Sequence, residues 1–294
     1  SSEEPILIVL LVDQSGSMGY EWGGSDDGTT LARSAMIAVN KSLYDLALNA
    51  CVTDSGIKDR VHIGAFEYSG WEGDGESGDK TVRWALRGLG EGNGWVEANR
   101  WVTGYESKEQ VAIDEDGGDP INMDLPIWIE EGANGGTPMC AAFRRAAEVV
   151  SVHNSLYPNS HPPIVINITD GVPTDTTSEY GGLEDWGEFR NAASLITSQS
   201  IEDGHALLLN IHITPNAGRD GKLIFPVEAP PGSSERVEQM LQISSILPAN
   251  MIVQGKASGY SMKEGARGLM LNADKALLSD FLKIGTTMTG APAA

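Results

Sequence analysis

A carboxylate and two hydroxyls lie close together near the start of the chain, in the sequence Asp13-Gln-Ser15-Gly-Ser17. They follow the apolar run 6–12, which is typical of a buried strand, so they stand in a glycine-containing turn at its end. Hard cations prefer oxygen ligands, and Mg²⁺ readily keeps waters in its shell. One carboxylate with neutral hydroxyls would leave such an ion electrophilic and open to an outside ligand. The turn therefore indicates part of a cation site.

Two later segments carry side chains of the same kind. Gly135-Gly-Thr137-Pro places a third hydroxyl just before a predicted helix, and Thr169-Asp170-Gly places a second carboxylate after the apolar run 164–168. Each cluster taken alone is also ordinary turn or helix-capping chemistry. All three, however, fall at junctions that lead from a strand or loop into a helix. The side chains that we expect to share one site are Asp13, Ser15, Ser17, Thr137 and Asp170.

In this order the clusters resemble the metal-ion-dependent adhesion site of von Willebrand factor A domains, whose pattern is Asp-x-Ser-x-Ser, then a distant Thr, then a distant Asp. The resemblance implies that Ser15, Ser17 and Thr137 bind the ion through their hydroxyls. Asp13 and Asp170 would bind it directly or through water. It also implies Mg²⁺ as the ion, with Mn²⁺ or Ca²⁺ as substitutes. The open coordination position would take an Asp or Glu of a partner protein.

The C-terminal part resembles a narrower group, the bacterial TerY-like A domains associated with tellurium resistance. This similarity rests on residues 265–274, on residues 281–285 and on the stretch Thr169-Asp-Gly-Val-Pro-Thr-Asp175. It implies a cytoplasmic binding module without catalytic activity, in a bacterial stress-response or conflict system. The partners that it implies are a metal-dependent protein phosphatase or a Ser/Thr kinase.

Short apolar runs alternate with helical patterns, which predicts a doubly wound, Rossmann-like α/β fold with a mainly parallel sheet and helices on both faces. Strands are expected at 6–12, 60–68, 164–169, 205–214 and 268–271. Helices are expected from 31 to about 51, after Thr137, and at 183–199, 235–247 and 274–284. Ligands of such sheets bind beyond the carboxyl ends of the strands, where the strand order reverses. Asp13 and Asp170 are both expected at that edge.

We interpret residues 1–294 as a single von Willebrand factor A domain with an acidic insertion, rich in Gly and Trp, at about 71–134. The insertion has 15 acidic and 5 basic residues. Edge strands are expected at 81–87 and 96–102, and loops elsewhere. Residues 114–119 are expected to form a solvated acidic turn, with a calcium loop as the alternative. The five tryptophans of the insertion are Trp71, Trp84, Trp95, Trp101 and Trp128. They could anchor a partner, but we expect them to pin the insertion to the sheet.

The whole chain is acidic, with 41 acidic and 20 basic residues and a formal charge of −21. Such a charge opposes binding to nucleic acids and to anionic membrane surfaces. No apolar run approaches the roughly 20 residues of a membrane helix, and the first residues show no charged-then-apolar leader. We therefore expect a cytoplasmic protein. Cys51 and Cys140 have apolar neighbours in predicted helices, where a free thiol acts as a small apolar group.

Two other functions are open at this point. An extracellular adhesin that depends on Ca²⁺ or Mg²⁺ is compatible with the acidity and with the A-domain pattern. A Mg²⁺-dependent phosphoryl-transfer enzyme could use Asp13 as a nucleophile. Against the enzyme, Asp13 has no second Asp two residues later, and no Walker loop accompanies it. A metal-dependent protein-interaction module is the function that we expect.

Overall fold

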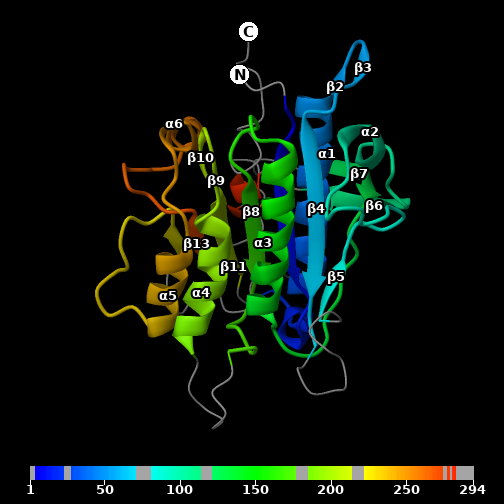
Figure 1. The fold of residues 1–294 in the computed structure, drawn as a ribbon. Helices are drawn as coiled ribbons and strands as arrows, with labels where there is room; N and C mark the ends of the chain where they lie inside the picture. Colours follow the sequence, from blue (N-terminus) through cyan, green and yellow to red (C-terminus); the bar gives the residue numbers. More distant parts are fainter. Residues whose placement is uncertain are drawn as a thin grey trace.

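A seven-stranded sheet forms the centre of the protein, in the strand order β12-β13-β11-β8-β1-β4-β5 (Figure 1). The computed structural model describes residues 4–22, 28–70, 81–113, 121–176, 185–213, 222–273, 277–278 and 280–282. The strands of the sheet are β1 (Ile6–Asp13), β4 (Val61–Tyr68), β5 (Val82–Trp84), β8 (Ile164–Thr169), β11 (Leu207–Ile213), β12 (Leu223–Ile224) and β13 (Leu269–Ala273). The five from β13 to β4 run parallel, and β5 and β12 pair antiparallel at the edges. The prediction of an α/β protein with a mainly parallel sheet is therefore confirmed.

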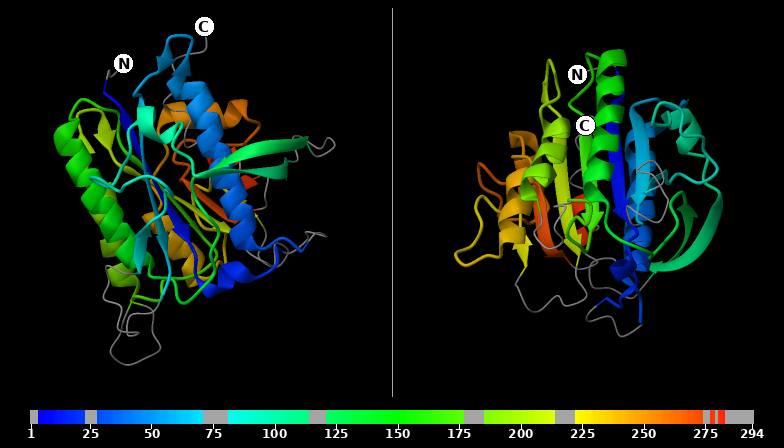
Figure 2. Two further views of the ribbon diagram at one scale, coloured as in Figure 1. Left: turned by 90° about the vertical axis from the view of Figure 1, so that its right-hand side faces the viewer. Right: turned by 60° about the horizontal axis from the view of Figure 1, so that its bottom comes forward.

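The central strands are mostly apolar because helices cover both faces of the sheet. Every residue of β1, β4, β8 and β11 is buried. Successive strand residues point to opposite faces. Residues 6, 8 and 10 of β1 accordingly pack in one cluster with α1 (Leu31–Leu46), and residues 7, 9 and 11 pack with α3 (Met139–Leu156) and α4 (Trp186–Thr197). Figure 2 shows α1 and α3 on opposite sides of the sheet.

The remaining helices follow the predicted order with two differences. Helix α1 ends earlier than expected and continues as a wide helical turn at Ala47–Cys51. The expected helix 235–247 is divided into α5 (Glu235–Ile243), which packs on the α3 side, and a separate α6 (Ala249–Ala257), whose Met251 joins the α1 cluster. Residues 277–278 and 280–282 are helical and fall in the predicted last helix, with Leu278 buried.

The segment 71–134 contains more regular structure than we predicted. Strand β5 lies at the sheet edge as expected, but residues 98–101 form the short helix α2 (Ala98–Trp101) where a strand was expected. The prediction of a strand was wrong because Asp59, from a distant loop, stabilises the start of this helix. Its Oδ1 accepts a hydrogen bond of 2.8 Å from the backbone N of Ala98. Such a bond satisfies a free amide at a helix start. The expected acidic turn at 114–119 lies outside the described residues.

A hairpin of β6 (Ser107–Ile113) and β7 (Ile121–Ile127) was also not predicted. It lies beside α1 (Figure 2). A third, smaller hydrophobic cluster joins the two elements, formed by Met36, Val111, Leu125 and Ile127. Two further short hairpins are formed by β2 (Val52–Thr53) with β3 (Gly56–Ile57) and by β9 (Ser200–Ile201) with β10 (Gly204–His205).

Three tryptophans of this segment face inward, and Trp84 of β5 is partly buried against the core. Trp95, Trp101 and Trp128 are all buried. The Nε1 of Trp101 donates a hydrogen bond of 2.9 Å to the carbonyl of Val61 on β4, and the Nε1 of Trp128 donates one of 2.7 Å to the carbonyl of Trp101. These residues therefore pin the segment to the sheet, as predicted. Trp71 lies outside the described residues.

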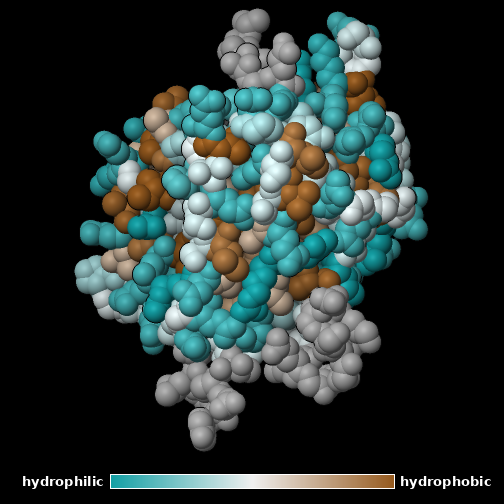
Figure 3. Space-filling view, viewed as in Figure 1, coloured by the Kyte–Doolittle hydropathy of each residue, from teal (hydrophilic) through white to brown (hydrophobic). Residues whose placement is uncertain are grey.

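The described surface is mixed in polarity. Figure 3 shows a mostly hydrophilic face with scattered hydrophobic residues. Within the part of the chain that the structure describes, no helix combines the length and the apolar character needed to cross a bilayer. Cys51 and Cys140 are buried, in line with the expectation that they act as small apolar groups.

Candidate functional site

The two predicted carboxylates lie at the carboxyl ends of adjacent parallel strands. Asp13 is the last residue of β1, and Asp170 directly follows β8, which pairs with β1. From β1 the chain reaches β4 on one side and later β8 on the other. The strand order therefore reverses between β1 and β8, which is where open parallel sheets form their ligand crevice.

Asp13 is fully buried and hydrogen bonded on both oxygens. Its Oδ1 accepts a bond of 2.8 Å from the backbone N of Ser15, and its Oδ2 accepts one of 2.6 Å from the Oγ1 of Thr169. Burial raises the pKa of Asp13 to about 7, although these donors favour the charged form. Burial also raises the pKa of Asp170. The site therefore holds two carboxylates whose negative charge is poorly solvated.

The two serines join Asp13 to Asp170. The Oγ atoms of Ser15 and Ser17 lie 3.2 Å apart, and the Oγ of Ser17 donates a hydrogen bond of 2.8 Å to the Oδ1 of Asp170. Ser17 belongs to a short 3₁₀ turn, Gly16–Gly19, which directs its hydroxyl across to the loop after β8. Four of the five predicted residues thus form one chain of contacts.

Thr137 reaches the same place from the loop before α3. A Cβ built on Gly171 would lie 3.1 Å from the Oγ1 of Thr137 and 3.9 Å from the Oδ2 of Asp13. Both oxygens therefore face the backbone of Gly171, the residue after Asp170. A larger residue here would crowd the Thr137 hydroxyl. The structure thus brings all five predicted residues together, whereas their role as metal ligands stays a prediction.

The loop before Thr137 is held against the turn after β1. The backbone N of Asn134 donates to the carbonyl of Gln14 at 2.7 Å, and the N of Gly16 donates to the carbonyl of Gly135 at 2.9 Å. Gly135 has a φ of +71°, and a Cβ there would lie 2.7 Å from the backbone of Gly70. Because only glycine tolerates both conditions, this residue fixes the path of the loop toward Thr137.

The donor set suits a hard cation. It contains two carboxylates and three hydroxyls, which are the oxygen ligands that Mg²⁺ and Ca²⁺ prefer. Within the described part of the chain, neither Asp13 nor Asp170 forms an ion pair with a basic side chain. A cation would supply the missing positive charge. The described residues contain no group of three His, Cys, Asp or Glu side chains placed to hold a metal, so this site would depend on its hydroxyls.

Three polar residues that the sequence analysis did not assign also take part. The Thr169 hydroxyl donates to Asp13. Thr174 forms two hydrogen bonds with Thr137: its Oγ1 accepts from the backbone N of Thr137, and its backbone N donates to the carbonyl of Thr137. Asp175 accepts hydrogen bonds from the backbone N of Cys140 and of Ala141, at 3.1 and 2.7 Å. Their only signal in the sequence was their place in the stretch 169–175 around Asp170.

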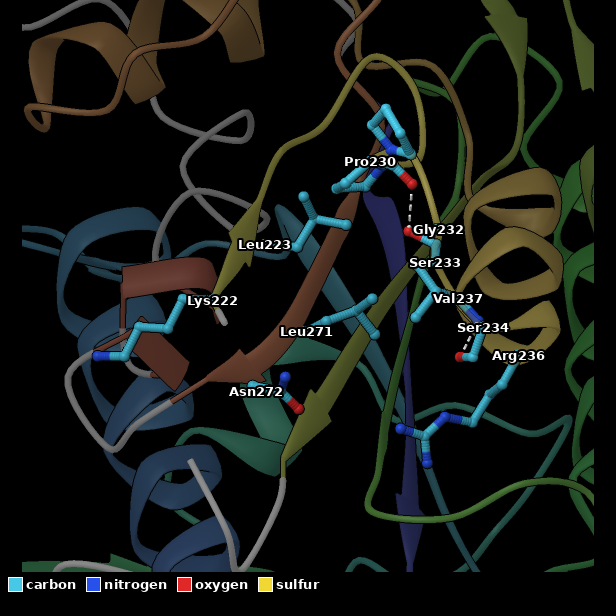
Figure 4. A pocket seen from close by; sticks show the side chains of 11 residues that line it. Lys222, Leu223, Pro230, Gly232, Ser233, Ser234, Arg236, Val237, Leu271 and Asn272 are labelled. Atoms are coloured by element: carbon cyan, nitrogen blue, oxygen red, sulfur yellow. Dashed lines mark hydrogen bonds between the residues drawn. The ribbon is translucent and has the colours of Figure 1, made fainter. Parts of the chain in front are cut away.

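A separate hollow of about 370 Å³ lies between β12, the end of β13 and the start of α5 (Figure 4). Leu223 and Leu271 lie on its strand side, and Lys222 extends away from the loop of Pro230 (Figure 4). The Oγ of Ser233 donates a hydrogen bond of 2.7 Å to the carbonyl of Pro230. None of the five predicted residues lines this hollow, so it is distinct from the candidate site.

Comparison with known proteins does not identify a family. No protein-family model matches the sequence, and no curated protein matches it. Among solved structures, the pilus adhesin SpaC from Lactobacillus rhamnosus GG is 13% identical with a TM-score of 0.45, over 97% of this chain and 30% of that chain. The PilB minor pilin from Streptococcus sanguinis is 8% identical with a TM-score of 0.48, over 98% of this chain and 62% of that chain. The human COPII-coat protein Sec24c is 8% identical with a TM-score of 0.33, over 72% of this chain and 28% of that chain.

This chain therefore spans less than two thirds of the length of each of these proteins. At such TM-scores and identities the likeness supports no conclusion about function.

Proposed function

We propose that the protein is a metal-dependent protein-interaction module of the von Willebrand factor A type, with a doubly wound fold. Asp13, Ser15, Ser17, Thr137 and Asp170 would hold one Mg²⁺ ion. The observation that carries the proposal is the contact chain from the buried Asp13 through Ser15 and Ser17 to Asp170. It joins two loops that are 153 residues apart at the point of strand reversal.

The chemistry of the site favours binding over catalysis. A bound Mg²⁺ supplies an electrophilic coordination position for a carboxylate oxygen of a partner protein. The side chains around it act by position: Thr169 holds Asp13 by a short hydrogen bond, and Ser17 holds Asp170. In the proposal both carboxylates bind the ion and hydroxyls fill the remaining positions, so the set leaves no further titratable side chain to act as acid or base in a phosphoryl-transfer reaction. The protein is proposed not to be an enzyme.

The partners and the location belong to the proposal as well. The TerY-like resemblance of the C-terminal part favours a cytoplasmic role in a bacterial stress response, with a metal-dependent phosphatase or a Ser/Thr kinase as partner. The formal charge of −21 favours a protein partner over nucleic acid.

Calorimetric titration with Mg²⁺ tests the metal site. The wild type is expected to bind one equivalent, and Asp13→Ala to lose binding, because the substitution removes the buried carboxylate at the centre of the contact chain. Asp203→Ala is the matched control: Asp203 is an exposed carboxylate in the turn between β9 and β10. Equal Mg²⁺ binding by wild type and Asp13→Ala, or no binding by the wild type, would overturn the proposal.

A random-peptide display selection tests the partner chemistry. Peptides selected in Mg²⁺ and released by a chelator are expected to share an Asp or Glu whose replacement by Asn or Gln ends binding. Recovery of peptides that bind equally well in chelator would contradict a metal-borne contact. Hydrolysis of an aryl phosphate that is lost in Asp13→Ala would favour the phosphoryl-transfer alternative.

A further inference from the structure

The segment 170–175 touches the candidate site at both of its ends. Asp170, at its start, accepts the hydrogen bond from Ser17. Thr174 and Asp175, at its end, contact the residues that begin α3. The segment therefore connects one predicted ligand, Asp170, with the element that carries another, Thr137.

Thr174 and Thr137 hold each other by two hydrogen bonds. The backbone N of Thr137 donates to the Oγ1 of Thr174 at 2.9 Å, and the backbone N of Thr174 donates to the carbonyl of Thr137 at 2.9 Å. Both bonds involve the main chain of Thr137. They therefore fix its Cα and the direction of its side chain, whose hydroxyl faces Gly171.

Asp175 supplies the N-terminal cap that α3 lacks. The residue before the helix is Pro138, which has no side-chain hydrogen bond to offer. The free amides of Cys140 and Ala141 instead donate to the two carboxylate oxygens of Asp175, at 3.1 and 2.7 Å. Asp175 is 5% exposed, so water cannot easily replace it. The start of α3, and Thr137 just before it, are thus tied to the strand-end loop that carries Asp170.

We propose that Thr174 and Asp175 are positioning residues that set the metal affinity of the site by holding the Thr137 hydroxyl against the Asp170 loop. The inference rests on the proposed function and adds two residues that do not touch the ion. Groups that orient metal ligands commonly change metal affinity by 10- to 100-fold when they are lost. A simple helix cap would change stability and leave the affinity of the folded protein unaltered.

The test compares Mg²⁺ affinity by calorimetry with thermal stability by circular dichroism, at a temperature where every variant is folded. Thr174→Val removes the hydroxyl that accepts from Thr137 and is expected to weaken Mg²⁺ binding about tenfold. Thr174→Ser keeps the acceptor and is expected to bind within about twofold of the wild type. Asp175→Ala is expected to weaken binding at least tenfold, and Asp175→Asn, which keeps one acceptor oxygen, to weaken it less.

Asp185→Ala is the matched control. Asp185 is the N-cap of α4 and accepts from the backbone N of Gly187 and of Glu188, at 2.9 and 3.2 Å, so it performs the same capping role on a helix that carries none of the proposed ligands. This variant is expected to melt a few degrees lower and to bind Mg²⁺ as the wild type does.

The outcomes separate the two proposals. If the wild type binds Mg²⁺ and Asp13→Ala does not, while Thr174→Val and Asp175→Ala bind with wild-type affinity, the positioning role is overturned and the metal site stands. If the wild type does not bind, the proposed function itself has failed. Should Asp175→Ala not fold, the contrast between Thr174→Val and Thr174→Ser decides the question alone.

Discussion

The candidate site depends on single hydroxyls that stabilise buried carboxylates. Asp13 is 0% exposed and depends on donors for solvation. The Thr169 hydroxyl donates to it at 2.6 Å, and the same Oγ1 accepts from the backbone N of Gly171 at 3.0 Å. One oxygen thus orders both strand ends. Removing a donor to a buried carboxylate leaves a polar group unsatisfied, which is more costly than the loss of an average hydrogen bond.

Thr169→Val is therefore expected to lower the free energy of unfolding by about 1–3 kcal/mol, measured by urea denaturation in the presence of a chelator. Thr169→Ser keeps the donor and should lose much less. Thr53→Val offers a comparison at an exposed turn, where the hydroxyl donates to the carbonyl of Gly56, and it should stay within about 0.5 kcal/mol of the wild type. An unchanged urea midpoint for Thr169→Val would show that Asp13 does not depend on this hydroxyl.

A buried histidine pair at the opposite edge of the sheet predicts a pH dependence of stability. The Nδ1 of His62 lies 3.2 Å from the Nε2 of His153, and the Nε2 of His62 lies 3.1 Å from the Oδ2 of Asp59. If His62 donates to Asp59, its Nδ1 accepts from His153. Burial, followed by the repulsion of His62, lowers the pKa of His153 to about 3. The unfolded chain therefore takes up a proton below about pH 6.5 that folded His153 does not accept.

The contribution of His153 to the free energy of unfolding is thus complete above about pH 6.5 and is lost as the pH falls toward 3. Its slope cannot exceed about 1.4 kcal/mol per pH unit, so from pH 7 to pH 5 the loss is about 2 kcal/mol. The difference in unfolding free energy between the wild type and His153→Gln should shrink by that amount over this range. A pH-independent difference for His153→Gln would contradict the expectation.

At the scale of elements, one buried side chain joins α1 to the segment that leads into the Thr137 loop. The Nδ2 of Asn40 donates to the carbonyls of Met36 and Ile129, at 3.0 and 2.8 Å. Its Oδ1 accepts from the backbone N of Trp128 and of Ile129, at 2.8 and 3.1 Å. The main chain at residues 128–129 belongs to no strand. The Asn40 side chain therefore supplies hydrogen bonds that a neighbouring strand would otherwise supply to these backbone groups.

Asn40→Ala should consequently lower the free energy of unfolding by at least about 3 kcal/mol, because it leaves three backbone groups of residues 128 and 129 buried without partners. Chemical denaturation measures this loss. Asn191→Ala, on the exposed side of α4, is the matched control and should change stability little. A loss below about 1 kcal/mol for Asn40→Ala would mean that water or a local shift satisfies these groups.

The sequence predicted those elements whose pattern is set by burial alone. The runs at 6–12, 60–68 and 164–169 are mostly apolar, because both faces of these strands are covered, and each is a strand in the structure. The hairpin β6-β7 buries one face of limited apolar content, in which Val111, Leu125 and Ile127 are the buried residues, so its pattern resembled a loop. Helix α2 depends on Asp59, 39 positions away in the sequence.

The same division applies to the candidate site. The order of its oxygen-bearing residues is visible in the sequence because each falls at a strand or helix end. The support of Thr137 by Thr174 and Asp175 depends on hydrogen bonds between residues 34 to 37 positions apart, and no local pattern marks them. Prediction from sequence therefore reached the proposed ligands but not the contacts that hold them.

At the scale of the whole molecule, the charge of −21 complicates every experiment with a divalent cation. A simple salt such as NaCl stabilises a strongly acidic protein, because counter-ions screen the repulsion between its carboxylates. A specific site adds a second contribution, which follows mass action and saturates. The two can be separated because screening depends on ionic strength and is almost independent of any one carboxylate.

We therefore expect Mg²⁺ at about 100 times its dissociation constant to stabilise the wild type by about 2.7 kcal/mol beyond NaCl of equal ionic strength. That corresponds to a rise in Tm of roughly 5 °C, measurable by scanning calorimetry. In Asp13→Ala the two salts should act alike, since the variant keeps the acidic surface and loses the proposed site. The control Asp203→Ala should retain the full Mg²⁺ effect. If Mg²⁺ stabilised Asp13→Ala as much as the wild type, its action would be diffuse screening of an acidic protein, and the cluster at the end of β1 would not hold the ion.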